Sequence, residues 1–142
     1  MSRSGYTEYE PSCQEENWDQ IRWRGAVLSA TRGSRGQRFF KELLAALDAM
    51  PDKKLIANEL EASGQFCTIG VLGDKRGVDM SEIDPEDAES VGAIFDIAES
   101  LAREVVYMND EGSYNSECPR QRFIRMRAWV ESQIAKPKVI KG

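Results

Sequence analysis

One amphipathic segment constrains the fold more than any other part of this sequence. Within residues 33–61, apolar side chains recur at i, i+3, i+4, i+7 and i+10, so they line one broad helical face. These residues are Phe40, Leu43, Leu44, Leu47 and Met50. Ser34 and Gln37 have the spacing of a capping box, and Pro51 cannot continue a helix. The pattern predicts a central helix against which the rest of the chain packs.

A first helix is predicted upstream, from a cap at Asn17 to Gly33. Its apolar residues fall on two neighbouring faces, so we expect other elements to cover it on two sides. One face consists of Trp18, Ile21, Gly25 and Leu28, and the other of Trp23, Val27 and Ala30. Glycine lowers helix propensity, so Gly25 predicts that another backbone passes close to this helix.

Three further helices are predicted in the C-terminal half. Asp84 caps the first of them, followed by a proline at the first helical position. A break at Asp96 starts the second helix at Ile97. We favour a plain helical hairpin here over a helix-turn-helix, because phosphates would repel the acidic second helix. The last helix lies between Pro119 and Pro137. Its apolar stripe consists of Phe123, Met126, Val130 and Ile134.

A β-hairpin is predicted between the central helix and the first of these three C-terminal helices. It pairs residues 54–60 with residues 65–72, although the first of these segments is also compatible with a helix. The predicted fold class is therefore α+β and mainly helical, with five helices and one small hairpin. The predicted organisation is a flexible N-terminal arm (1–16), a single globular domain (17–135) and a basic C-terminal tail (136–142).

Composition excludes several kinds of chemistry. The 142 residues include no histidine, so neither a Ser-His-Asp triad nor a histidine-containing zinc site can be built from this chain alone. The three cysteines lie far apart, and Cys67 is expected to be a small core side chain. We therefore predict no catalytic residues, no metal site, no cofactor and no enzymatic activity. No apolar run is long enough to span a membrane, and the polar N-terminus is unlike a signal peptide, so we expect a cytoplasmic protein.

Charge is distributed very unevenly along the chain. Residues 79–117 carry twelve acidic side chains and one basic side chain, Arg103. We predict that four of these carboxylates face outward together and bind a basic partner: Glu86, Glu89, Glu99 and Asp110. The alternative is that the acids are neutralised within the chain by arginines of the last helix, Arg120, Arg122, Arg125 and Arg127.

A second candidate surface is basic. Glycines at 33 and 36 would let backbone N–H groups face an anion where the central helix begins, although the spacing of a P-loop is absent. The alternative is an ordinary solvated face. The arginines of this surface are Arg22, Arg24, Arg32, Arg35 and Arg38.

Four sequence blocks resemble a small uncharacterised family of proteins encoded by tailed phages and prophages. The resemblance covers about residues 20 to 135, through IRWRGAV, GQRFFKELLAALDAMPDKKLIANELE, AREVVYMNDEG and RFIRMRAWVESQI. It implies a phage-encoded accessory protein in the host cytoplasm, and it assigns no catalytic residue. With the acidic surface, it suggests a protein that binds a basic host protein or nucleoprotein complex, and that inhibits a host defence or regulatory protein. The alternative function is a nucleic-acid-binding phage regulator that uses the arginines of residues 22–38.

Overall fold

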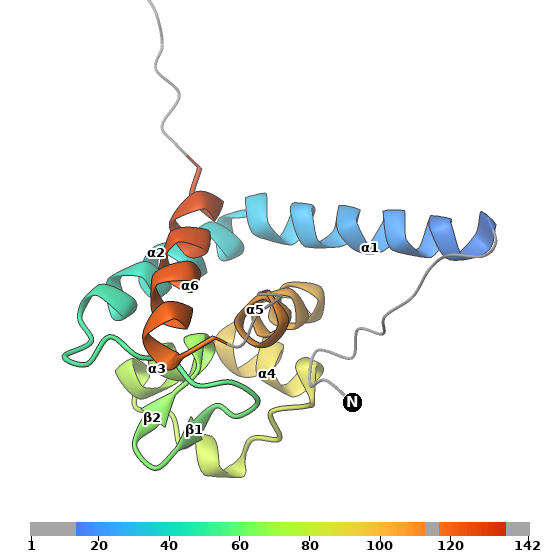
Figure 1. Cartoon of the computed structure of the whole chain (residues 1–142). Helices are drawn as coiled ribbons and strands as arrows, with labels where there is room; N and C mark the ends of the chain where they lie inside the picture. The colour runs from blue at the N-terminus through green and yellow to red at the C-terminus, as the bar shows by residue number, and fades with distance from the viewer. Residues whose placement is uncertain (1–13, 113–116, 136–142) are drawn as a thin grey trace, which may run out of the picture.

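The computed structural model describes residues 14–112 and 117–135, which contain six α-helices, a two-stranded antiparallel hairpin and one 3-10 turn (Figure 1). The elements are α1 (Gln14–Arg32), α2 (Ser34–Asp48), β1 (Glu61–Ala62), β2 (Gln65–Phe66), α3 (Thr68–Arg76), η1 (Met80–Glu82), α4 (Ala88–Phe95), α5 (Glu99–Glu111) and α6 (Pro119–Gln133). The fold is α+β and mainly helical, as predicted, with one more helix than expected. The buried apolar side chains form a single core.

Helix α2 lies at the centre of this core, which confirms the prediction from its amphipathic face. Phe40, Leu43 and Leu47 are completely buried between α3 and α6. The ring of Phe40 meets the ring of Trp129 on α6 edge to face, with 5.6 Å between their centroids. Burial of such apolar faces supplies most of the stability of a short helix.

The start of α2 differs from the predicted capping box. Gly33 is the N-cap residue, and the cap has no side-chain hydrogen bond. The amide of Gln37 is used elsewhere: its Nε2 donates to the carbonyl oxygens of Thr31 (2.8 Å) and Gln133 (3.0 Å). A Cβ atom at Gly36 would overlap the carbonyl oxygen of Ala30. The turn from α1 into α2 therefore needs glycine at position 36 and a long amide at position 37.

Among the described residues, helix α1 is covered on one side, not on two. Trp23 and Val27 are half-buried on the side that faces α5, whereas Ile21 is 60% exposed and Leu28 is 51% exposed. A Cβ atom at Gly25 would meet nothing within 4 Å. The predicted second cover and the predicted close backbone approach are therefore both wrong within the described chain. Figure 1 shows α1 extending past the body of the molecule.

The predicted hairpin is real but far shorter than expected. Its strands are two residues each, with Glu61 opposite Phe66 and Ala62 opposite Gln65. Residues 54–60 contain neither a strand nor a helix, and most of the predicted second strand is helix α3. The sequence alternates there, with Cys67, Ile69 and Val71 on one side, which favours a strand. All residues from Thr68 to Gly73 are buried, however, so this alternation does not separate a buried face from an exposed one.

Helices α4 and α5 form the predicted helical hairpin, but each begins later in the sequence than predicted. Helix α4 begins at Ala88 with Asp87 as its N-cap, because Asp84 instead caps a turn by accepting a hydrogen bond from the Glu86 N–H (2.9 Å). The break falls at Asp96, which adopts a left-handed conformation with φ of 56°, and α5 starts at Glu99 rather than at Ile97. Helices α4 and α5 then pack against each other.

The last helix begins at Pro119, as predicted. Phe123, Met126 and Val130 are buried, and Ile134 is half-buried at the C-cap. The expected stop at Pro137 and the C-terminal tail lie outside the described residues. So does most of the expected N-terminal arm, although residues 14–16 already belong to α1.

Candidate functional site

The most concentrated charge in the described chain is a run of carboxylates from Asp79 to Glu89, which we name the acidic segment. It contains η1, the following turn and the first residues of α4. All six of its carboxylates are exposed, and none forms an ion pair with another described residue. They are Asp79, Glu82, Asp84, Glu86, Asp87 and Glu89.

Hydrogen bonds to the chain fix the shape of the acidic segment. Asp79 Oδ1 accepts from the Ser81 N–H (3.1 Å) and hydroxyl (2.6 Å). Asp87 accepts from the Ser90 N–H (3.2 Å) and hydroxyl (2.8 Å). The serine hydroxyls, together with the backbone donors, lower the pKa of Asp79 and of Asp87. Met80 is buried and anchors η1 to the core. These hydrogen bonds therefore fix the shape of the segment and favour the ionised forms of Asp79 and Asp87.

The structure separates the four predicted partner-binding carboxylates. Glu86 and Glu89 lie in the acidic segment, whereas Glu99 accepts from Arg103 (2.7 Å) one turn further along α5. Asp110 is half-buried at the opposite end of α5, where it accepts from the Asn58 N–H (3.0 Å). The surface thus keeps two of the predicted residues. The other four carboxylates of the acidic segment were not predicted. The signal for them in the sequence is a dense run of acidic residues without a basic one.

The arginines of α6 do not neutralise the acidic segment. Arg122 and Arg125 both pair with Glu117, at 3.3 and 2.7 Å, and lower the pKa of its carboxyl; the hydrogen bond from Arg125 is the larger cause. Arg125 also donates to the carbonyl oxygen of Met108 (2.5 Å), near the C-terminus of α5. Arg127 pairs with Asp48 on α2 (2.6 Å). Among the twelve acidic residues of the range 79–117, these three arginines of α6 therefore pair only with Glu117, and the predicted alternative of wider neutralisation is not observed for them.

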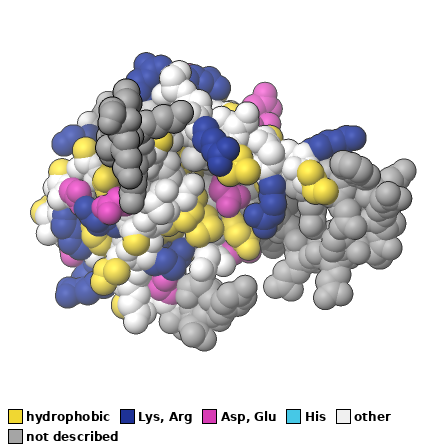
Figure 2. Space-filling model, turned by 90° about the horizontal axis from the view of Figure 1, so that it is seen from above, with side chains coloured by type: hydrophobic (Ala, Val, Ile, Leu, Met, Phe, Trp, Pro, Cys, Tyr) yellow, Lys and Arg dark blue, Asp and Glu magenta, His cyan; other side chains and the backbone are white. Residues whose placement is uncertain are grey.

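The predicted basic surface occupies the second half of α1 and the start of α2. Its five arginines (Arg22, Arg24, Arg32, Arg35 and Arg38) are all exposed, and Arg35 pairs with Asp96 (3.2 Å). Figure 2, which views the molecule from above, shows basic side chains spread over this face, with hydrophobic and some acidic side chains between them.

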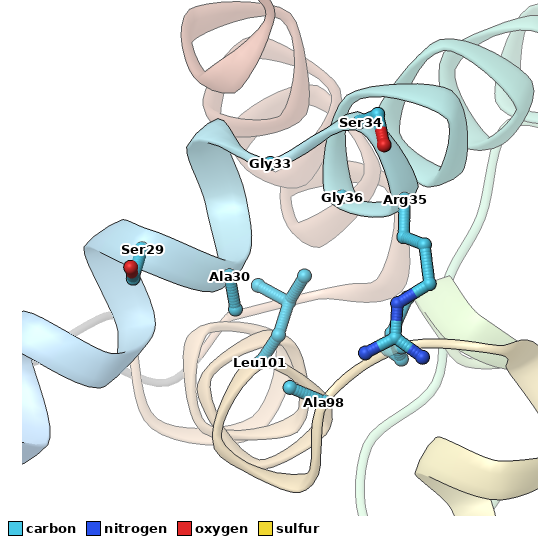
Figure 3. A pocket seen from close by; sticks show the side chains of 9 residues that line it. Ser29, Ala30, Gly33, Ser34, Arg35, Gly36, Ala98 and Leu101 are labelled. Carbon is cyan, nitrogen blue, oxygen red and sulfur yellow. The ribbon is translucent and has the colours of Figure 1, made fainter.

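A cavity of about 250 Å³ opens beside these arginines, between α1, α2 and α5 (Figure 3). Helices α2 and α5 both begin at this cavity, and neither N-cap residue supplies a side-chain hydrogen bond. Backbone N–H groups at helix starts and a nearby guanidinium favour an anion. The lining residues are Ser29, Ala30, Gly33, Ser34, Arg35, Gly36, Ile97, Ala98 and Leu101.

A second cavity, of about 240 Å³, lies between the end of α2, the hairpin and α3. Its charged lining residues are of both signs, namely Asp52, Lys54, Asp74 and Lys75. Asp52 lies 4.0 Å from Lys54. Cys67 is buried as the N-cap of α3, where its Sγ accepts from the Gly70 N–H (3.4 Å), as expected for a small core side chain. No group of three or more potential metal ligands converges in the described part of the chain.

No protein-family model, curated protein or solved structure matches the chain. The resemblance to a phage-encoded family therefore stays a prediction. None of the described helices is long and apolar enough to cross a membrane.

Proposed function

We propose that the protein acts by binding, with its acidic segment docked on a basic surface of another protein or of a nucleoprotein complex. The observation that supports this most directly is the exposure of six carboxylates that have no ion-pair partner among the described residues. A fixed surface of one sign raises the encounter rate with a partner of the opposite sign and disfavours acidic competitors.

Local order strengthens this proposal. Asp79 and Asp84 each accept a hydrogen bond from a backbone N–H within the segment, and Asp87 accepts one from Ser90 next to it. These three carboxylates are therefore positioned before a partner arrives. Preorganisation reduces the conformational entropy lost on binding. A disordered acidic tail of the same charge would lose more entropy for the same contacts.

The resemblance to phage-encoded proteins supports a bacterial host as the setting. A phage accessory protein in the host cytoplasm would act by covering the basic surface of a host defence or regulatory protein. The proposal includes the absence of catalytic turnover, because the sequence offers no histidine and no recognisable arrangement of a nucleophile with its base.

A charge-matched pair of variants tests the proposed surface. The acidic-segment variant carries Glu82→Gln, Glu86→Gln and Glu89→Gln, and the control variant carries Glu59→Gln, Glu61→Gln and Asp74→Asn. Both remove three exposed negative charges, but the control removes them outside the acidic segment. We expect the acidic-segment variant to bind a lysine-rich peptide roughly tenfold more weakly in an anisotropy titration at low salt, and the control to bind like the wild type.

The same variants are then compared as baits in host lysate. Partners that depend on the acidic segment should be captured by the wild type and the control, and lost by the acidic-segment variant or at high salt. If both variants lose binding equally, only the net charge matters, and the proposed surface is wrong.

The basic surface supports a second candidate function, binding of nucleic acid. The observation that favours it is the cavity at which two uncapped helix starts meet Arg35. Duplex DNA should then bind with an affinity that falls steeply with salt. Arg35→Ala with Arg38→Ala should weaken binding regardless of DNA sequence, whereas Arg120→Ala with Lys75→Ala should not. A titration at low salt without binding would remove this candidate.

A further inference from the structure

Helix α1 has an outward face that no described element covers. Ile21, Gly25, Leu28 and Arg32 follow one another at i, i+4, i+7 and i+11, so they form a single strip. Ile21 and Leu28, at the first and third positions of this strip, are 60% and 51% exposed. Figure 1 shows the helix at the edge of the molecule, with α5 on its other side. We name this strip, together with the flanking Arg24, the α1 face.

Gly25 at the middle of the α1 face has no explanation within the described fold. A glycine inside an exposed helix costs about 1 kcal/mol relative to alanine. No described atom lies within 4 Å of where its Cβ would be, so packing inside this part of the chain does not require it. A helix position without a side chain allows the backbone of another molecule to approach closely.

The acidic segment has the properties that match the α1 face. It carries six exposed carboxylates, opposite in sign to Arg24 and Arg32, and much of it is irregular backbone rather than helix. Ile94, on the neighbouring α4, is 41% exposed and offers apolar area to a partner. Figure 1 shows the yellow segment that leads into α4 on the far side of α5 from α1, so the two surfaces of one molecule do not meet.

We propose that the α1 face of one copy binds the acidic segment of a second copy. The two surfaces differ, so the contact is heterologous and repeats from head to tail, which gives rings or open chains rather than a symmetric pair. Charge supplies much of the attraction, so the association is weak and decreases as salt rises. This inference goes beyond the proposed function by assigning a role to α1, and it makes a second copy a competitor for the acidic segment.

Two complementary variants test the head-to-tail contact. The α1-face variant carries Arg24→Gln and Leu28→Gln, which leaves the acidic segment intact. Its counterpart is the acidic-segment variant defined above, which leaves α1 intact. Both variants carry neutral substitutions, so that mixing them introduces no new attraction between opposite charges. Sedimentation velocity at low salt measures the size of each protein alone and of their equimolar mixture.

We expect the wild type to form species larger than a dimer as its concentration rises, and each variant alone to remain a monomer. The mixture should form a one-to-one dimer that grows no further, because each variant retains the one surface that the other lacks. Gly25→Gln should weaken wild-type association roughly tenfold without lowering the melting temperature, because it obstructs close approach.

Several outcomes would overturn the inference. A wild type that stays monomeric at every concentration would do so, as would association that neither variant changes. If the acidic-segment variant still dimerises by itself, the α1 face binds another α1 face instead. Binding of the lysine-rich peptide is measured separately on the α1-face variant, which should keep it. Loss of self-association and loss of the proposed function are thereby distinguished.

Discussion

The side chain of Asn109 on α5 holds the first residue of α3, Thr68. Its Oδ1 accepts from both the backbone N–H (3.1 Å) and the hydroxyl (2.8 Å) of Thr68, and its Nδ2 donates to the carbonyl oxygen of Ile56 (2.9 Å). Asn109 and Thr68 are 1% and 0% exposed, so water cannot replace these bonds. One amide thus joins α5 to α3 and to the irregular segment after α2.

Asn109→Ala should therefore destabilise the fold strongly. It leaves two buried donors and one partly buried acceptor without their partners, for which we expect a loss of about 2–4 kcal/mol in the free energy of unfolding. Thr68→Val removes the hydroxyl alone and should cost about 1 kcal/mol. Urea denaturation followed by circular dichroism measures both. Equal losses for the two variants would contradict the central role of the amide.

Acid should destabilise the protein partly through Glu117. Arg125 and Arg122 lower the pKa of this carboxyl below its ordinary value of 4.5 in the folded state. The stabilisation is thus fully present above the unfolded pKa and is lost as pH falls through the folded pKa. Glu117→Gln should cost about 1–3 kcal/mol at neutral pH and make unfolding less dependent on pH below 4.5. The control Glu131→Gln, at an exposed pair, should change little. A pH profile of Glu117→Gln parallel to that of the wild type would count against this account.

Replacing Gly25 or Gly36 with alanine should change the stability of the protein in opposite directions. At Gly25 a Cβ meets no described atom, so Gly25→Ala should stabilise the protein by about 0.5–1 kcal/mol through helix propensity. At Gly36 a Cβ overlaps the Ala30 carbonyl, so Gly36→Ala should cost about 1–3 kcal/mol. Melting temperatures of the two variants provide the comparison. A shift of the same sign in both would be inconsistent with the observed α1–α2 turn.

Order and charge in the acidic segment can be separated at Asp87. Asparagine caps a helix about as well as aspartate, so Asp87→Asn removes a charge and keeps the cap. Asp87→Ala removes both. We expect only Asp87→Ala to lower the denaturation midpoint, and both to weaken binding of the basic peptide, with the larger effect in Asp87→Ala. If the two variants bind the peptide equally, a fixed segment is not needed for binding.

The sequence by itself determined the elements that bury one face and expose the other. Phe40, Leu43 and Leu47 on α2, and Phe123 and Met126 on α6, recur at helical spacing because each helix contacts the core along one side. The break at Asp96 was also predictable, although each neighbouring helix starts a few residues later than local capping patterns suggest. The uneven charge, and so the existence of an acidic surface, likewise follows from the order of residues.

Only the tertiary structure decided what those surfaces contain. The first six residues of α3, from Thr68 to Gly73, are all buried, so burial leaves no periodic pattern to distinguish this part of the helix from a strand. The apolar residues of α1 fall on two faces, and sequence does not tell which face α5 covers and which stays open. The acidic segment stays without ion pairs among the described residues because three arginines of α6 are held elsewhere. Arg127 reaches Asp48 on α2, which is distant in sequence, and Arg122 and Arg125 are held at Glu117 beside the end of α5. Charge pairing depends on which side chains folding brings within a few ångströms of each other, and that distance is set by packing of the whole chain.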